Sequence, residues 1–205
     1  MSAPARPDSP ARLEALIAAL KAKGILTEEE LSARQEQTDR ASPEIGARMV
    51  ARAWLDPEWR QLLLSDGTAA AEALGVSMAG APPLGVLEDT PQRHHLVVCT
   101  LCSCYPRAVL GYPPHWYKSF GYRARAVRDP RGVLAEWGTA LPEGVEVRVV
   151  DSTADFRWMV LPLRPAETDG WSEDRLTEII TRDVLVGVAL PRPPPSTTSA
   201  QASWS

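Results

Sequence analysis

Hydrophobic residues recur at helical spacing along the first third of the chain. Leu13, Leu16, Ile17 and Leu20 repeat at intervals of three and four residues, and Gly24 follows where such a helix would end. Three further helix-start signals come in series: the capping-box run at 27–30, Ser42-Pro43 and Asp56-Pro57. No strand pattern interrupts them, so we predict a helical arm over residues 11–78 whose short helices gain stability by packing on something larger.

After residue 80 the pattern changes to short apolar runs typical of strands. These runs lie at 84–87, 96–99, 145–150, 156–163 and 184–190. Helix starts at Asp129-Pro130 and Ser172 separate some of them. Because strands and helices alternate irregularly, we predict an α+β layered domain over residues 79–190. Residues 1–10 and 191–205 are rich in Pro, Ser and Ala, which predicts a flexible lead and a disordered tail.

Composition narrows the functional classes. The chain has 205 residues, with 22 Lys+Arg against 26 Asp+Glu and a formal net charge of -4. That balance offers no excess of positive charge for phosphates, so we expect no nucleic-acid partner. No apolar run approaches the roughly 18 residues of a membrane span, and the N-terminus does not resemble a secretory signal. A cytoplasmic protein without membrane contact is the expectation.

The three cysteines form one cluster, with the pattern C-x-x-C-x-C at 99, 102 and 104. An odd and low number argues against a disulfide-stapled scaffold, whereas thiolates suit soft or borderline transition metals. A tetrahedral zinc site would need a fourth ligand, and His94 and His95 point to opposite sides of an extended strand. The nearest other donors are the backbone amides of Ser103 and Cys104.

Spacing alone leaves three alternatives open for this cluster. It could be a structural zinc clip completed by a distant residue, a thiol redox switch between Cys99 and Cys102, or a set of inert buried thiols.

The surrounding residues favour one family. The runs VCTLCSCYP at 98–106, LGYPPHWYK at 110–118, YRARAVRDPR at 122–131 and RPAETDGW at 164–171 closely resemble the α subunit of nitrile hydratases. The resemblance extends from about Arg12 to Pro191. It implies that the helical arm wraps around a partner β subunit and that the remaining domain is an α-β-β-α layered sandwich carrying the Cys-x-x-Cys-x-Cys metal loop.

The resemblance also implies a role for each residue of the metal loop. Cys99 would be the axial thiolate, Cys102 the cysteine oxidised to sulfinic acid, and Cys104 the one oxidised to sulfenic acid. Ser103 and Cys104 would add deprotonated backbone amide nitrogens, which leaves a sixth position for water or substrate. Thr100 is typical of the cobalt type rather than the iron type. The implied cofactor is therefore a non-corrin Co(III) ion, with Cys102 and Cys104 as catalytic residues.

The implied enzyme hydrates a nitrile to an amide and needs other proteins. A trivalent metal with an open position polarises a bound nitrile. In the family, arginines of the β subunit hold the oxidised sulfurs, so the chain would act in a heterodimer or a higher heteromer. A cobalt-insertion or activator protein is a further expected partner.

The residues after the loop are compatible with more than one substrate. Tyr105 and Arg107 are expected to face it, but most nitrile hydratases carry Trp at position 107, whereas thiocyanate hydrolases resemble this chain in having Arg there. An arginine suits an anion. The γ subunit of a thiocyanate hydrolase is therefore one alternative, and a non-catalytic metal-binding or carrier subunit is another. The close match at 122–131 favours nitrile hydratase.

Charged residues farther along have two readings each. Asp151, Asp155 and Arg157 match family residues that position the β-subunit arginines, or they form an ordinary ion pair on a strand surface. A second set of charged residues is basic and comprises Lys118, Arg123, Arg125, Arg128 and Arg131. Because the net charge of the chain is -4, we expect these residues to form a subunit interface or a solvated face rather than to bind nucleic acid.

Overall fold

The computed structural model describes residues 9–194 and divides the chain into two compact units at Arg40 and Ala41. The first unit holds helices α1 (Ser9–Ala22) and α2 (Glu28–Arg40). The predicted capping box before α2 is confirmed, because the Thr27 and Glu30 side chains each accept a hydrogen bond from the other's backbone N–H. Most of the predicted lead and tail lies outside the described residues, although residues 9 and 10 already belong to α1.

The second unit begins with three helices, α3 (Pro43–Leu55), α4 (Pro57–Ser65) and α5 (Gly67–Ala73). Ser42 and Asp56 cap α3 and α4 through their side chains, as predicted, and Asp66 caps α5 in the same way. Met49 and Val50 of α3 are fully buried. Helices α3 to α5 therefore belong to the core of the second unit, and the arm predicted for residues 11–78 crosses the division at Arg40.

Four parallel-paired strands follow. β1 (Leu84–Glu88) pairs with β4 (Arg157–Leu161), and β2 (Arg93–Val98) pairs with β3 (Glu146–Asp151). These strands confirm four of the five apolar runs predicted as strands. The register of the second pair sets Asp151 opposite Val98, the residue before the first cysteine.

The strand predicted for residues 184–190 is wrong. Helix α11 (Arg182–Leu185) occupies the start of that run, and Gly187 then turns the chain with a φ of 80°. The Val97 N–H donates to the Val186 carbonyl at 2.9 Å, and a Cβ at Gly187 would lie 1.9 Å from the His95 carbonyl oxygen. The run is apolar because it is pressed against β2, and burial of this kind produces the same pattern as a strand.

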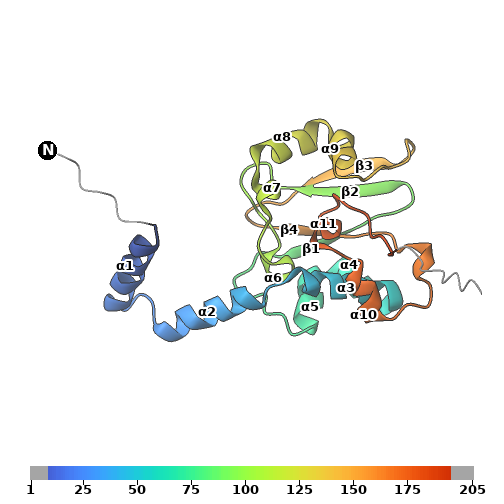
Figure 1. Ribbon diagram of the computed structural model, residues 1–205. Helices are drawn as coiled ribbons and strands as arrows, with labels where there is room; N and C mark the ends of the chain where they lie inside the picture. The colour runs from blue at the N-terminus through green and yellow to red at the C-terminus, as the bar shows by residue number, and fades with distance from the viewer. Residues whose placement is uncertain (1–8, 195–205) are drawn as a thin grey trace, which may run out of the picture. The chain divides into compact units, whose positions relative to one another are not determined.

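The second unit is layered, as Figure 1 shows. Helices α8 (Phe120–Arg128) and α9 (Pro130–Glu136) cover the β2–β3 sheet, the β1–β4 sheet lies next, and α3, α4, α5 and α10 (Glu173–Glu178) lie beyond it. This confirms the predicted α+β class with an α-β-β-α layered domain. The short α6 (Arg107–Leu110), α7 (His115–Lys118) and the 3-10 turn Ala166–Thr168 lie in connections. Within the described residues, no helix is long and apolar enough to cross a membrane.

Candidate metal centre

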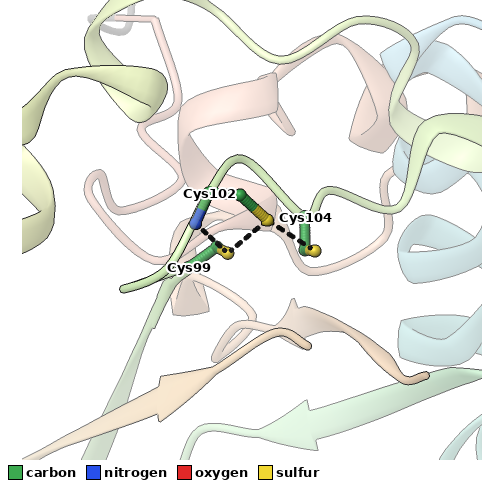
Figure 2. Close-up of side chains that lie close together, drawn as sticks. All are labelled: Cys99, Cys102 and Cys104. Carbon is green, nitrogen blue, oxygen red and sulfur yellow. Dashed lines mark hydrogen bonds between the residues drawn. The ribbon is translucent and has the colours of Figure 1, made fainter. Parts of the chain in front are cut away.

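The loop that follows β2 brings the three cysteine sulfurs together. The Sγ atoms of Cys99 and Cys102 lie 3.5 Å apart and those of Cys102 and Cys104 lie 3.2 Å apart, with all three within 4.8 Å of one another (Figure 2). Two sulfurs bound at right angles, each about 2.3 Å from one ion, would be about 3.3 Å apart. The spacing therefore fits three ligands of a single metal ion. Cys99 and Cys104 are buried, whereas Cys102 is exposed.

Backbone amides of the loop also face the sulfurs. The Cys102 N–H donates to the Cys99 sulfur at 3.3 Å (Figure 2). Hydrogen bonds from the Cys104 and Cys99 thiols, and then from the backbone N–H groups of Ser103 and Cys104, lower the pKa of Cys102 to about 7. The two amides predicted as ligands therefore lie close enough to the Cys102 sulfur to lower its pKa.

The thiol of Cys104 behaves in the opposite way. Burial, together with its hydrogen bonds to the Cys102 and Cys99 thiols, raises the pKa of Cys104 to about 12, and the charge of Arg157 counters this only in part. The cluster therefore carries one thiol that ionises readily beside one that ionises with difficulty. A bound cation would lower the pKa of Cys104, because a thiol that coordinates a metal ion is deprotonated outright.

Side chains from three other elements hold the loop. Asp151 accepts hydrogen bonds from the Thr100 N–H at 3.0 Å and from the Thr100 hydroxyl, and Arg123 donates to the Thr100 carbonyl at 3.4 Å. At the other end, the Tyr117 hydroxyl donates to the Cys104 carbonyl at 2.9 Å. Neither Arg123 nor Tyr117 was predicted in this role: Arg123 was assigned to a basic group, and Tyr117 was marked only by its place in a family-like run.

The two predicted substrate-contacting residues differ in exposure. Tyr105 is only 3% exposed and packs edge-on against Tyr117 with ring centroids 4.9 Å apart, and burial raises the pKa of its phenol. Arg107 is exposed, and its guanidinium lies 5.7 Å from the centre of the Tyr112 ring. Only Arg107 presents its side chain to solvent, and contact with substrate stays a prediction for both.

The three charged residues predicted behind the site are not equivalent. Asp151 contacts the loop directly, and Arg157 acts on the Cys104 thiol through its charge. Asp155 lies in an exposed turn, where its backbone N–H donates to the Thr153 hydroxyl at 3.3 Å. Within the described part of the chain no ion pair joins them, so their role toward a partner's arginines stays a prediction.

The two histidines before the loop form hydrogen bonds to groups outside the loop. His94 and His95 lie in β2, as predicted, but both are buried and both bind Asp89 through Nδ1 at 3.0 Å. The His94 Nε2 lies 2.7 Å from the Gly187 carbonyl oxygen, so both of its ring nitrogens face oxygen acceptors, which favours the protonated ring. Burial alone would lower the pKa of His94, but the hydrogen bond and charge of Asp89 raise it. Among the described residues, the group able to bind a metal contains the three cysteines and no histidine.

Comparison with known proteins gives consistent matches. The family described as "Nitrile hydratase, alpha chain" matches residues 7–189. The chain is 48% identical to thiocyanate hydrolase subunit gamma of Thiobacillus thioparus over 83% of this chain and 75% of that protein. It is also 48% identical to the low-molecular weight cobalt-containing nitrile hydratase subunit alpha of Rhodococcus rhodochrous, over 90% of this chain and 89% of that one. A solved structure of recombinant thiocyanate hydrolase with partially modified cobalt centres matches with a TM-score of 0.84 and 45% identity, covering 92% of each chain.

Proposed function

The chain belongs to the nitrile hydratase alpha-chain family, and from this premise we propose that it is the cobalt-binding catalytic subunit of a nitrile hydratase. The observation that carries the proposal is the convergence of three sulfurs within 4.8 Å, with the amides of Ser103 and Cys104 close enough to the Cys102 sulfur to lower its pKa. Thr100 within the motif and the cobalt-containing relatives support cobalt rather than iron.

Cys99, Cys102 and Cys104 would hold the ion through sulfur, and Ser103 and Cys104 through backbone nitrogen. Bound there, a trivalent cobalt ion supplies a Lewis acid that polarises the nitrile for hydration to the amide. The exposed Cys102, whose pKa is lowered to about 7, suits oxidation to sulfinic acid, and the neighbouring Cys104 is proposed as the sulfenic acid. The buried Cys99 would remain a thiolate.

Partner proteins complete the proposal. Leu13 and Leu16 on α1 are more than half exposed, and Leu101 at the tip of the metal loop is 87% exposed. We propose that a β subunit covers these apolar side chains and that its arginines hold the oxidised sulfurs. A cobalt-insertion protein and a cytoplasmic location belong to the same proposal.

A second candidate is a γ-type subunit of a thiocyanate hydrolase. Arg107 favours it, because this exposed guanidinium lies three residues after Cys104 and suits an anionic substrate. The relative from Thiobacillus thioparus supports it equally by identity. A non-catalytic metal carrier would use the same loop without the reaction.

The test is co-expression with the β partner in cobalt-containing medium. We expect about one cobalt per chain, and two cysteines that carry about one and two added oxygen atoms by mass spectrometry of the intact chain. Amide formed from a nitrile panel supports nitrile hydratase, and loss of thiocyanate supports the second candidate. Correct cobalt and oxidation without either activity would indicate a carrier. Full zinc occupancy with unmodified thiols in an active heteromer would overturn the cobalt proposal.

A further inference from the structure

Arg123 occupies an unusual position for an arginine on a surface helix. It projects from α8 and is half-buried, and its Nη1 donates to the Thr100 carbonyl at 3.4 Å. Its Nε is buried without a hydrogen-bond partner in the described part of the chain. Removing a guanidinium N–H from water without an acceptor is costly. What this position of Arg123 provides is the hydrogen bond to the Thr100 carbonyl of the cysteine loop.

Thr100 is bound from two separate elements. Asp151, at the end of β3, accepts from its N–H and its hydroxyl, while Arg123 donates to its carbonyl. Every polar group of Thr100 is therefore tied to a charged side chain. Since Thr100 lies directly after Cys99 and two residues before Cys102, these bonds restrict the stretch of backbone that separates the first two sulfurs.

The other arginines of α8 do not share this contact. Arg125 pairs through both terminal nitrogens with Glu136 at 2.7 Å, and Arg128 is exposed. Arg123 therefore differs from the other arginines of α8, and Arg128 on the same helix can serve as a matched control.

We propose that Arg123 is a positioning residue, which clamps Thr100 together with Asp151 and so preorganises the three sulfurs for a metal ion. The clamp is a property of the metal-free loop, and only its consequence for cobalt rests on the proposed function. Preorganised ligands bind more tightly because less conformational freedom is lost on binding.

Hydrogen exchange in the metal-free chain tests the clamp itself. In Arg123→Gln, the Thr100 and Cys102 amides should exchange about fivefold faster, in line with the loss of one hydrogen bond. Arg128→Gln should leave them unchanged, and Arg123→Lys, which keeps a cationic donor, should restore most of the protection. Thermal melting of the whole chain should stay the same in all three variants. Equal exchange in Arg123→Gln and Arg128→Gln would overturn the proposal.

Cobalt titration tests the consequence. Followed by thiolate-to-cobalt absorption, Arg123→Gln should bind Co(II) about fivefold more weakly than the parent and with shifted bands. Combining Arg123→Gln with Asp151→Asn should weaken binding by less than the product of the single effects, because both act through Thr100. A fully multiplicative result would refute the shared clamp. If the parent chain binds no cobalt, the proposed function fails, while the exchange measurement still decides on the clamp.

Discussion

Replacing Asp89 by Asn should destabilise the protein strongly, because this carboxylate organises a buried charged cluster at the start of β2. Asp89 is 5% exposed and accepts three hydrogen bonds, from the His95 N–H at 2.7 Å and from the Nδ1 atoms of His94 and His95 at 3.0 Å each. The variant removes the counter-charge of the buried His94 and sets an amide in place of the acceptor for two imidazole nitrogens. Breaking a buried pair in this way costs about 3–5 kcal/mol of unfolding free energy.

The pH dependence of stability tests the same cluster. The pKa of His94 is raised, so its contribution is fully present below the ordinary histidine value and is lost as pH rises through the raised value. Burial alone would raise the pKa of Asp89, but its hydrogen bonds to His94 and His95 lower it, so its contribution is present above the ordinary carboxyl value and is lost as pH falls through the lowered value. Asp89→Asn should remove the slope due to Asp89 and reverse the slope due to His94, because burial alone lowers the pKa of His94 and stability is then lost as pH falls.

Urea unfolding of the purified chain, followed by tryptophan fluorescence at several pH values, measures both effects. Asp155→Asn is the matched control, because that carboxylate lies in an exposed turn and its loss should change stability by no more than about 0.5 kcal/mol. An Asp89→Asn variant within about 1 kcal/mol of the parent, or with an unchanged dependence on pH, would refute the buried ion pair.

Three further predictions follow from the site and its supports. Iodoacetamide should modify the metal-free chain first at Cys102, with a half-maximal rate near pH 7, and peptide mass spectrometry that finds another cysteine modified first would contradict the pKa argument. If the second candidate function holds, Arg107→Trp should lower kcat/KM for thiocyanate about tenfold and leave the cobalt content unchanged, whereas equal turnover would exclude Arg107 as an anion contact. Gly187→Ala should lower the free energy of unfolding in urea by roughly 2–4 kcal/mol, because the new Cβ meets a carbonyl of β2. Gly138→Ala is the control, with a similar φ and open space around it, and should lower that free energy by about 1–2 kcal/mol. Equal losses would show that only the φ angle matters.

Sequence predicted the parts of this molecule that depend on neighbouring residues. Ser42 and Asp56 cap their helices through N–H groups two or three residues away, so the start of each helix can be read locally. The cysteine cluster was predictable for the same reason, because its ligands fall within six residues. The run at 184–190 failed because an apolar stretch reports burial, and its conformation is set by the close approach of Gly187 to β2.

Contacts between distant residues account for what the sequence could not show. Arg123 and Asp151 meet at Thr100 from 23 and 51 residues away, and nothing in the spacing of either residue points to that carbonyl or that amide. Arg123 was predicted as part of a basic group, and Asp151 either as a residue that positions a partner's arginines or as part of a surface ion pair. Their role appears only when the register of β2 and β3 and the position of α8 are known.

The histidine pair next to the cysteine loop is bound to other groups and does not supply a further metal ligand. Alternation along β2 predicts that His94 and His95 point to opposite sides, yet Asp89 binds both, because each carboxylate oxygen takes one Nδ1. The remaining nitrogen of His94 is bonded to the Gly187 carbonyl. The zinc clip completed by a distant residue is also disfavoured, because within the described residues no His, Asp or Glu side chain joins the three sulfurs. The nearest other donors are the Ser103 and Cys104 amides, which lie close enough to the Cys102 sulfur to lower its pKa, and this supports the proposed backbone ligands.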